Sequence, residues 1–187
     1  MSRTLTVLAL VAASQLAGCA AVVVGGAATG ASVATDRRTA GVYLGDQEIE
    51  LRAMNRLEEA FPKNSISSTS YNRQVLLTGQ VPDAATKTRA TEIVQGIPDV
   101  RGVFNELAVS GPTSLASDAN DVSLTTQVKT RLLRDERVPG LKLKVVTEAG
   151  VVYLMGLTTR TEAAAAADIA STTSGVTRVV TLFEYLD

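Results

Sequence analysis

The chain has 187 residues, and its 18 basic and 19 acidic side chains give a net charge of −1. A chain so close to neutral has no bulk attraction to nucleic acid. It contains no histidine, no tryptophan and one cysteine, which excludes thiol–imidazole and serine–histidine catalysis and any metal site built from cysteine and histidine. The composition therefore argues against an enzyme and indicates no cofactor.

Residues 1–19 are predicted to be a secretory signal peptide. Arg3 gives the charged start, an apolar stretch follows over 5–13, and Leu-Ala-Gly-Cys ends at Cys19. These four residues resemble the lipobox of bacterial lipoproteins, in which the cysteine thiol is diacylated and the cysteine becomes the new N-terminus. An ordinary secretory signal is the alternative, but a lone cysteine suits acylation because it forms no internal disulfide. The resemblance also implies sorting to the outer membrane, because Ala20 is not the aspartate of inner-membrane retention signals.

Residues 20–45 are predicted to be a tether. The stretch 20–34 is rich in alanine, valine and glycine and is too short to span a bilayer. Gly26 and Gly30 have the spacing of membrane helix pairs, but glycines disfavour an isolated helix. We therefore expect a flexible or membrane-surface connection.

The rest of the chain contains one unit of roughly 65 residues twice. The apolar runs Val75–Gly79 and Val152–Gly156 end at glycines 77 positions apart. A second match, at an offset of 75, pairs Ile49, Ala53 and Leu57 with Leu124, Val128 and Leu132. Units this small bury only about 60% of their unfolded surface, so we expect the two copies to pack on each other.

Each copy is predicted to have the order αββαβ, an α+β layer in which two helices cover one face of a three-stranded sheet. The first copy has predicted helices at 46–61 and 84–95, the latter capped by Asp83, and strands at 65–71, 73–81 and 100–109. The segment 110–120 reads as a break. The second copy has predicted helices at 122–135, capped by Asp121, and at 162–174, with strands at 141–145, 151–157 and 176–186.

Two such units, each with a Val-x-Leu-x-Gly strand, resemble BON domains. Together with the lipobox and the short tether, they resemble the dual-BON outer-membrane lipoproteins of the DolP type, with domains at 46–110 and 121–187 and a linker at 111–120. The resemblance implies residence on the periplasmic side of the outer membrane and a role in envelope integrity, including at division sites. It also implies binding of anionic phospholipid, such as phosphatidylglycerol or cardiolipin, through the second domain.

The predicted helix after Asp121 has two different faces. Leu124, Val128 and Leu132 form the core face, and the outer face carries Val122, Ser123, Thr126, Lys129, Leu133 and Arg137. Apolar residues flanked by cations suit a membrane-docking surface. The alternatives are packing against the first domain or scattered surface residues. In the family this helix can carry an aromatic anchor near its start, where this chain has Ser123.

Basic residues cluster around this helix, at Lys129, Arg131, Arg134, Arg137, Lys142 and Lys144. If four of them reach an anionic surface, about 1 kcal/mol each gives a millimolar affinity, which an acyl tether would raise through effective concentration. The competing hypothesis is a non-catalytic protein adaptor. Its patch would bind an envelope protein, such as an outer-membrane assembly factor or a regulator of cell-wall hydrolysis.

Overall fold

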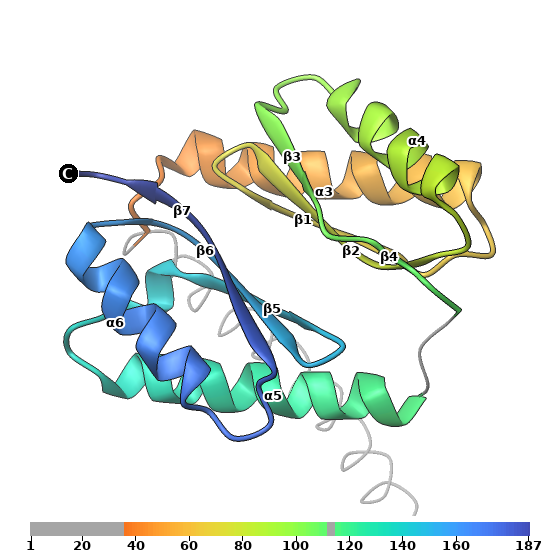
Figure 1. The fold of residues 1–187 in the computed structure, drawn as a ribbon. Helices are drawn as coiled ribbons and strands as arrows, with labels where there is room; N and C mark the ends of the chain where they lie inside the picture. Colours follow the sequence, from red (N-terminus) through yellow and green to blue (C-terminus); the bar gives the residue numbers. More distant parts are fainter. Residues whose placement is uncertain (1–35, 112–114) are drawn as a thin grey trace, which may run out of the picture. The chain divides into compact units, whose positions relative to one another are not determined.

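The computed structural model shows one order of helices and strands twice along the chain (Figure 1). The first copy consists of α3 (Ala40–Ala60), β1 (Ile66–Tyr71), β2 (Gln74–Val81), α4 (Ala84–Gln95), β3 (Gly102–Asn105) and β4 (Ala108–Val109). The second consists of α5 (Leu115–Arg134), the 3-10 helix η1 (Gly140–Lys142), β5 (Lys144–Glu148), β6 (Val151–Thr158), α6 (Arg160–Ser171) and β7 (Arg178–Tyr185). Residues 36–111 and 115–187 are described, so the predicted signal peptide, Cys19 and the predicted tether up to residue 35 lie outside the described residues.

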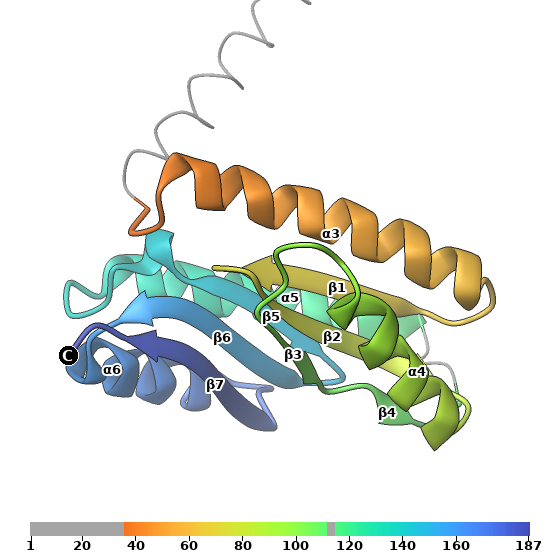
Figure 2. The same cartoon turned by 90° about the horizontal axis from the view of Figure 1, so that it is seen from above.

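Each copy has a mixed sheet with the strand of the repeated motif at its centre. In the first copy β2 pairs antiparallel with β1 and parallel with β3, and β4 pairs further along the same strand. In the second copy β6 pairs antiparallel with β5 and parallel with β7. Two helices lie against one face of each sheet (Figure 2). The predicted fold class is therefore confirmed.

The central strands are buried on both faces. Val75 and Leu77 of β2 pack with the helices of the first copy, whereas Leu76 between them points to the opposite side. Along β6, alternate residues divide in the same way between the core of the second copy and the opposite face. Burial on both faces explains why these strands are continuous apolar runs in the sequence.

The opposite faces of the two sheets pack on each other. Tyr71 and Leu76 of the first copy form one buried cluster with Tyr153 and Met155 of the second. This cluster confirms the expected packing of the two copies. Residues Arg37–Asp187 accordingly form one compact unit, and a fragment of residues 36–187 contains both cores and every described helix and strand.

The glycines that end the repeated motif lie at close approaches. Gly79 has a φ of +117°, and a Cβ atom there would overlap the carbonyl oxygen of Ser65. A Cβ atom on Gly156 would overlap the side chain of Leu143. Glycine, which lacks Cβ, is required at position 79, whereas at position 156 a shift of the flexible Leu143 side chain would relieve the overlap.

The first helix of each copy begins earlier than the sequence predicts. Thr39 caps α3, and its Oγ1 accepts a hydrogen bond from the Val42 amide at 3.3 Å. Helix α5 begins at Leu115 and includes part of the segment predicted as a break. The prediction that Asp121 caps this helix is therefore wrong, because Asp121 lies within α5.

The second copy departs from prediction at two further places. Gly140–Lys142 form a 3-10 turn after Pro139, so the predicted strand at 141–145 begins only at Lys144. Helix α6 begins earlier and ends earlier than predicted, with a capping box made by Thr159 and Glu162.

The two aspartates at matching positions in α3 and α5 have the same role. Asp46 accepts hydrogen bonds from the backbone amides of Asn72 and Arg73, both at 2.7 Å. Asp121 accepts the amides of Ala149 and Gly150 at 2.6 and 2.9 Å. All four turn residues have positive φ, between 50° and 76°, the conformation of the two-residue turn that matches strand twist. Each buried carboxylate therefore fixes a hairpin turn to the first helix of its copy.

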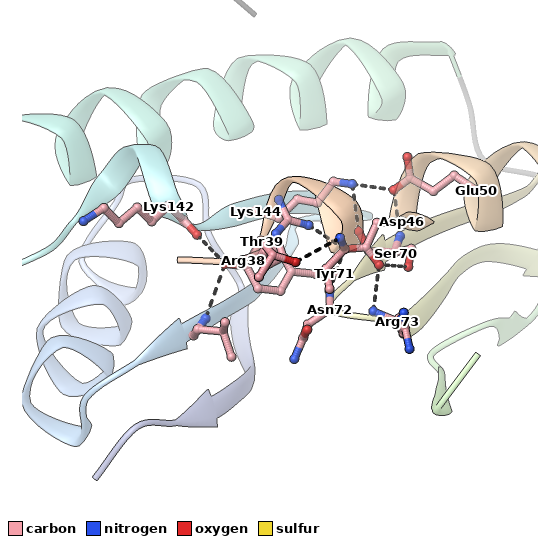
Figure 3. A network of polar contacts seen from close by, with 12 residues as sticks. Arg38, Thr39, Asp46, Glu50, Ser70, Tyr71, Asn72, Arg73, Lys142 and Lys144 are labelled. Carbon is pink, nitrogen blue, oxygen red and sulfur yellow. Dashed lines mark hydrogen bonds and ion pairs between the residues drawn. The ribbon is translucent and has the colours of Figure 1, made fainter. Parts of the chain in front are cut away.

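A polar network surrounds Asp46 at the boundary between the copies (Figure 3). The guanidinium of Arg38 donates to Asp46 at 2.7 Å and lies 3.9 Å from the ring centroid of Tyr71. The Tyr71 hydroxyl donates to the carbonyl oxygen of Lys142, in the second copy, at 2.9 Å. Beside it, Lys144 of the second copy forms an ion pair with Glu50 of the first. The boundary thus combines apolar packing with directional polar contacts.

Arg37 binds the second copy, whereas its neighbour Arg38 binds the first. Two guanidinium nitrogens of Arg37 each donate to Glu162 at 2.6 Å, and one also donates to the Leu157 carbonyl oxygen at 2.8 Å. Hydrogen bonding from Arg37 lowers the pKa of the Glu162 carboxyl from 4.5 to about 2. Two successive residues before α3 therefore tie the two copies together.

Asp121→Ala should destabilise the 36–187 fragment by about 2–4 kcal/mol, because two turn amides lose their acceptor and each buried unsatisfied amide costs about 1–3 kcal/mol. Urea unfolding followed by circular dichroism measures this loss. Asp168→Ala, an exposed aspartate on α6, is the matched control and should change stability little. A loss below about 0.5 kcal/mol for Asp121→Ala, within the usual range for surface substitutions, would show that the turn does not depend on the carboxylate.

Glu162→Gln should remove the ion pair with Arg37 while keeping a residue that completes the capping box. Because the folded pKa of Glu162 is lowered, its contribution is present above about pH 4.5 and lost as the pH falls toward about 2. We expect the variant to lose about 1 kcal/mol near neutral pH, with the difference from wild type shrinking at low pH. The exposed Glu136→Gln should match wild type at every pH, and a pH-independent loss for Glu162→Gln would contradict the linkage.

Candidate functional site

The outer face of α5 exposes two large apolar side chains. Val122 is 69% exposed and Leu133 is 53% exposed, whereas Leu124, Val128 and Leu132 are buried. The predicted division of this helix into a core face and an outer face is therefore confirmed. Exposure of this degree also means that neither Val122 nor Leu133 is packed into the first copy.

The polar residues of this face leave it open to solvent. Ser123, Thr126 and Lys129 are all exposed. The Thr126 hydroxyl donates to the carbonyl oxygen of Val122 at 2.9 Å, so it is satisfied by its own helix. Lys129 forms no ion pair with any described residue. The face thus presents apolar groups and a positive charge without internal partners for them.

Arg137 differs from its predicted place on this face. Helix α5 ends at Arg134, so Arg137 lies in the following loop rather than on the helix. Its guanidinium binds Asp135 at 2.6 and 2.9 Å, and this hydrogen bonding lowers the pKa of the Asp135 carboxyl to about 2. The charge of Arg137 is therefore largely compensated, and Arg137 is exposed beside the helical face.

Two of the six clustered basic residues serve the fold. Arg131 donates to the Ile169 carbonyl oxygen at 2.8 Å and to the Thr173 hydroxyl at 2.6 Å, which ties α5 to the end of α6. Lys144 is paired with Glu50. Lys129, Arg134 and Lys142 form no ion pair within the described part of the chain. Arg131 keeps its positive charge, because its acceptors are neutral. Among the described residues, four cations of the cluster therefore have no carboxylate partner, and three of them lie on α5.

A groove of about 400 Å³ lies beside the first turns of α5, and Val122 is one of the residues that line it. Its lining includes Asp118, Asp121 and Glu148, and burial raises the pKa of the Glu148 carboxyl. Acidic walls repel a phosphate group. The groove is therefore unsuited to an anionic headgroup, which leaves the outer face of α5 as the candidate.

A second exposed apolar row, on α3, escaped the sequence analysis. Leu44, Leu51 and Met54 are 64%, 55% and 51% exposed. The predicted start of the helix after residue 45 left out Leu44 and hid the row. Among residues 36–111 and 115–187, acidic side chains form no group able to hold a metal ion. No helix within those ranges has the length and apolar character needed to cross a membrane.

Comparison with known proteins agrees with this architecture. The model of a family described as the BON domain matches residues 45–111 and 120–187. The chain is 44% identical over 175 residues to the outer membrane lipoprotein DolP of Haemophilus influenzae, a match that covers 92% of this chain and 91% of that protein. It is 32% identical to the 21 kDa hemolysin of Actinobacillus pleuropneumoniae, over 81% of this chain and 79% of that one. The osmotically-inducible protein Y of Escherichia coli is 28% identical, over 80% of this chain and 77% of its own length.

These matches cover both copies of the repeat and, in the first relative, nearly the whole chain. The family is not known as one of enzymes. The chain belongs to the BON-domain family, as an outer-membrane lipoprotein of the DolP type.

Proposed function

We propose that this protein is a non-catalytic, periplasm-facing lipoprotein that binds anionic phospholipid through the outer face of α5 and so helps to maintain the outer membrane. The observation that carries the proposal is the exposure of Val122 and Leu133 beside the uncompensated Lys129. Phosphatidylglycerol and cardiolipin are the proposed ligands. We include action at division sites in the proposal because the family resemblance implies it.

The proposed contact combines apolar insertion with charge attraction. Val122 and Leu133 would lie at the headgroup level, with Ser123 and Thr126 beside them and Arg137 at the edge. Lys129 and Arg134 contribute about 1 kcal/mol each near an anionic surface, and complete burial of a Val or Leu side chain contributes about 1.5–3 kcal/mol. Partial insertion of both side chains gives a binding free energy of about −5 kcal/mol, a Kd on the order of 0.1–1 mM.

Such a weak contact suits a protein that is already held at the membrane. We propose that acylated Cys19 supplies this anchor and keeps the α5 face at high effective concentration near the lipid. Cys19 lies outside the described residues, and its role is supported by the lipobox and by the lipoprotein relative. The weak lipid site then determines how the domains rest on the membrane, not whether the protein stays there.

Leu133→Glu should weaken flotation of the 36–187 fragment with phosphatidylglycerol or cardiolipin vesicles while leaving the melting temperature unchanged, because Leu133 is exposed. Leu132→Glu is the matched control one residue away. It should unfold the second copy, because its side chain is fully buried and an unpaired buried charge is costly. Circular dichroism melting beside flotation separates the two effects.

Several outcomes decide the lipid proposal. Binding should fall with added salt and should be absent with neutral phosphatidylcholine vesicles. Ser123→Trp should strengthen binding if the helix lies at the headgroup level, where tryptophan is favoured. No flotation of the wild-type fragment, together with its retention by a purified envelope protein, would favour the adaptor function instead. Melting of Leu133→Glu as severe as that of Leu132→Glu would make this face part of the fold.

Cys19→Ala should give full-length protein that takes up no labelled palmitate and detaches from the membrane fraction, because the diacylglyceryl group is joined to the cysteine sulfur by a thioether. Fractionation of cells after metabolic labelling measures both properties. A cysteine-to-alanine variant that stays with the outer membrane without label would overturn the anchoring role of Cys19.

A further inference from the structure

Helices α3 and α5 are equivalent in the duplicated fold, so their outer faces are comparable residue by residue. At the offset of 75, Arg56 of α3 matches Arg131 of α5. Arg56 donates to the Gly96 carbonyl oxygen at the end of α4, as Arg131 does to Ile169 near the end of α6. The two helices therefore sit in the same way on their own sheets and turn matching positions to solvent.

The matching positions carry opposite charge. Glu59 of α3 stands where α5 has Arg134, and Glu58 stands where α5 has Leu133. Glu48 is paired with Arg52, but Glu58 and Glu59 form no ion pair within the described residues. The outer face of α3 thus keeps two uncompensated negative charges, whereas α5 keeps the positive charges of Lys129 and Arg134.

The acidic face of α3 also has a row of exposed apolar side chains. Leu44 and Leu51 are seven residues apart and Met54 follows three residues later, so all three lie on one side of the helix. More than half of each side chain is exposed. From Leu44 to Met54 the row is about 15 Å long. Spacings of seven and three residues are those of the apolar seam positions that contact a second helix in a coiled coil.

The charge of this face decides which occupant fits. An anionic membrane, the proposed ligand of α5, would be repelled by Glu58 and Glu59. A helix with apolar residues on one side and lysine or arginine along its flanks would bury the row and pair with those glutamates. We propose that the outer face of α3 docks a basic amphipathic helix of a protein partner. This inference does not rest on lipid binding by α5.

The size of the face sets the strength of the contact. A row of three apolar side chains on one helix gives an interface at the small end of the range for specific complexes, which is typical of transient association. Both partners at one membrane would meet at high effective concentration. The contact would then be salt-sensitive and weak in solution, and it would leave α5 free for lipid.

Two synthetic helical peptides test the proposal against the 36–187 fragment by fluorescence anisotropy. Both have leucines at the seam positions; one has lysines on its flanks and the other has glutamates. The lysine peptide should bind at least tenfold more tightly than the glutamate peptide. A Leu51→Gln/Met54→Gln variant and a Glu58→Lys/Glu59→Lys variant should each weaken binding at least tenfold without changing the melting temperature.

Leu133→Gln on α5 is the control and should bind the lysine peptide as wild type does. Equal affinity for both peptides, or no effect of the α3 variants, would overturn the proposal. Self-association of the fragment that is abolished by the Leu51→Gln/Met54→Gln variant would assign the face to a second copy of this chain. Loss of vesicle flotation in that variant would assign it to lipid. If only the lipid proposal fails, Leu133→Glu will not weaken vesicle flotation, and the preference for the lysine peptide will be unchanged.

Discussion

A buried carboxylate that accepts two turn amides is the interaction on which each copy of the fold depends. Asp46 and Asp121 lie in the first helix of their copies, yet each binds the turn between the first two strands. That turn needs positive φ at both of its residues, and only one of the four, Gly150, is a glycine. Charge-assisted hydrogen bonds stabilise the turn, while the turn amides compensate the burial of the charge. Each carboxylate therefore connects helix, turn and sheet, which suits a unit too small to rely on its core alone.

The same interaction organises the boundary between the copies. Asp46 also accepts a hydrogen bond from the guanidinium of Arg38, which stacks on the Tyr71 ring. Tyr71 in turn belongs to the apolar cluster shared by both sheets. Arg37, the preceding residue, is bound to Glu162 in the second copy. The segment that enters α3 is thus held by both copies at once. Side chains that satisfy the local fold therefore also hold the two copies in contact.

The sequence was sufficient for the fold class and for the two faces of α5, because both depend on periodicity. It was not sufficient for Asp121, since an aspartate three residues before the first core leucine fits both a helix cap and a buried acceptor. The partners of two residues of the basic cluster could not be predicted for a related reason. Arg131 and Lys144 find their partners in segments far away in the chain, and spacing along the sequence does not reveal such contacts. The apolar row on α3 was missed because it begins at Leu44, before the predicted start of the helix.

Duplication explains how one architecture can present two unlike surfaces. The core positions of α3 and α5 are constrained by their sheets, and Asp46 and Asp121 are constrained by their turns, so these positions match in both copies. The outer positions compared above, Glu58 and Glu59 on α3 and Leu133 and Arg134 on α5, are exposed and are free to diverge. Substitution there costs little stability, whereas reversal of charge changes which surface is attracted and which is repelled. Glu59 and Arg134 occupy equivalent places with opposite charge, so the outer faces of the two first helices differ in which charged surface each attracts.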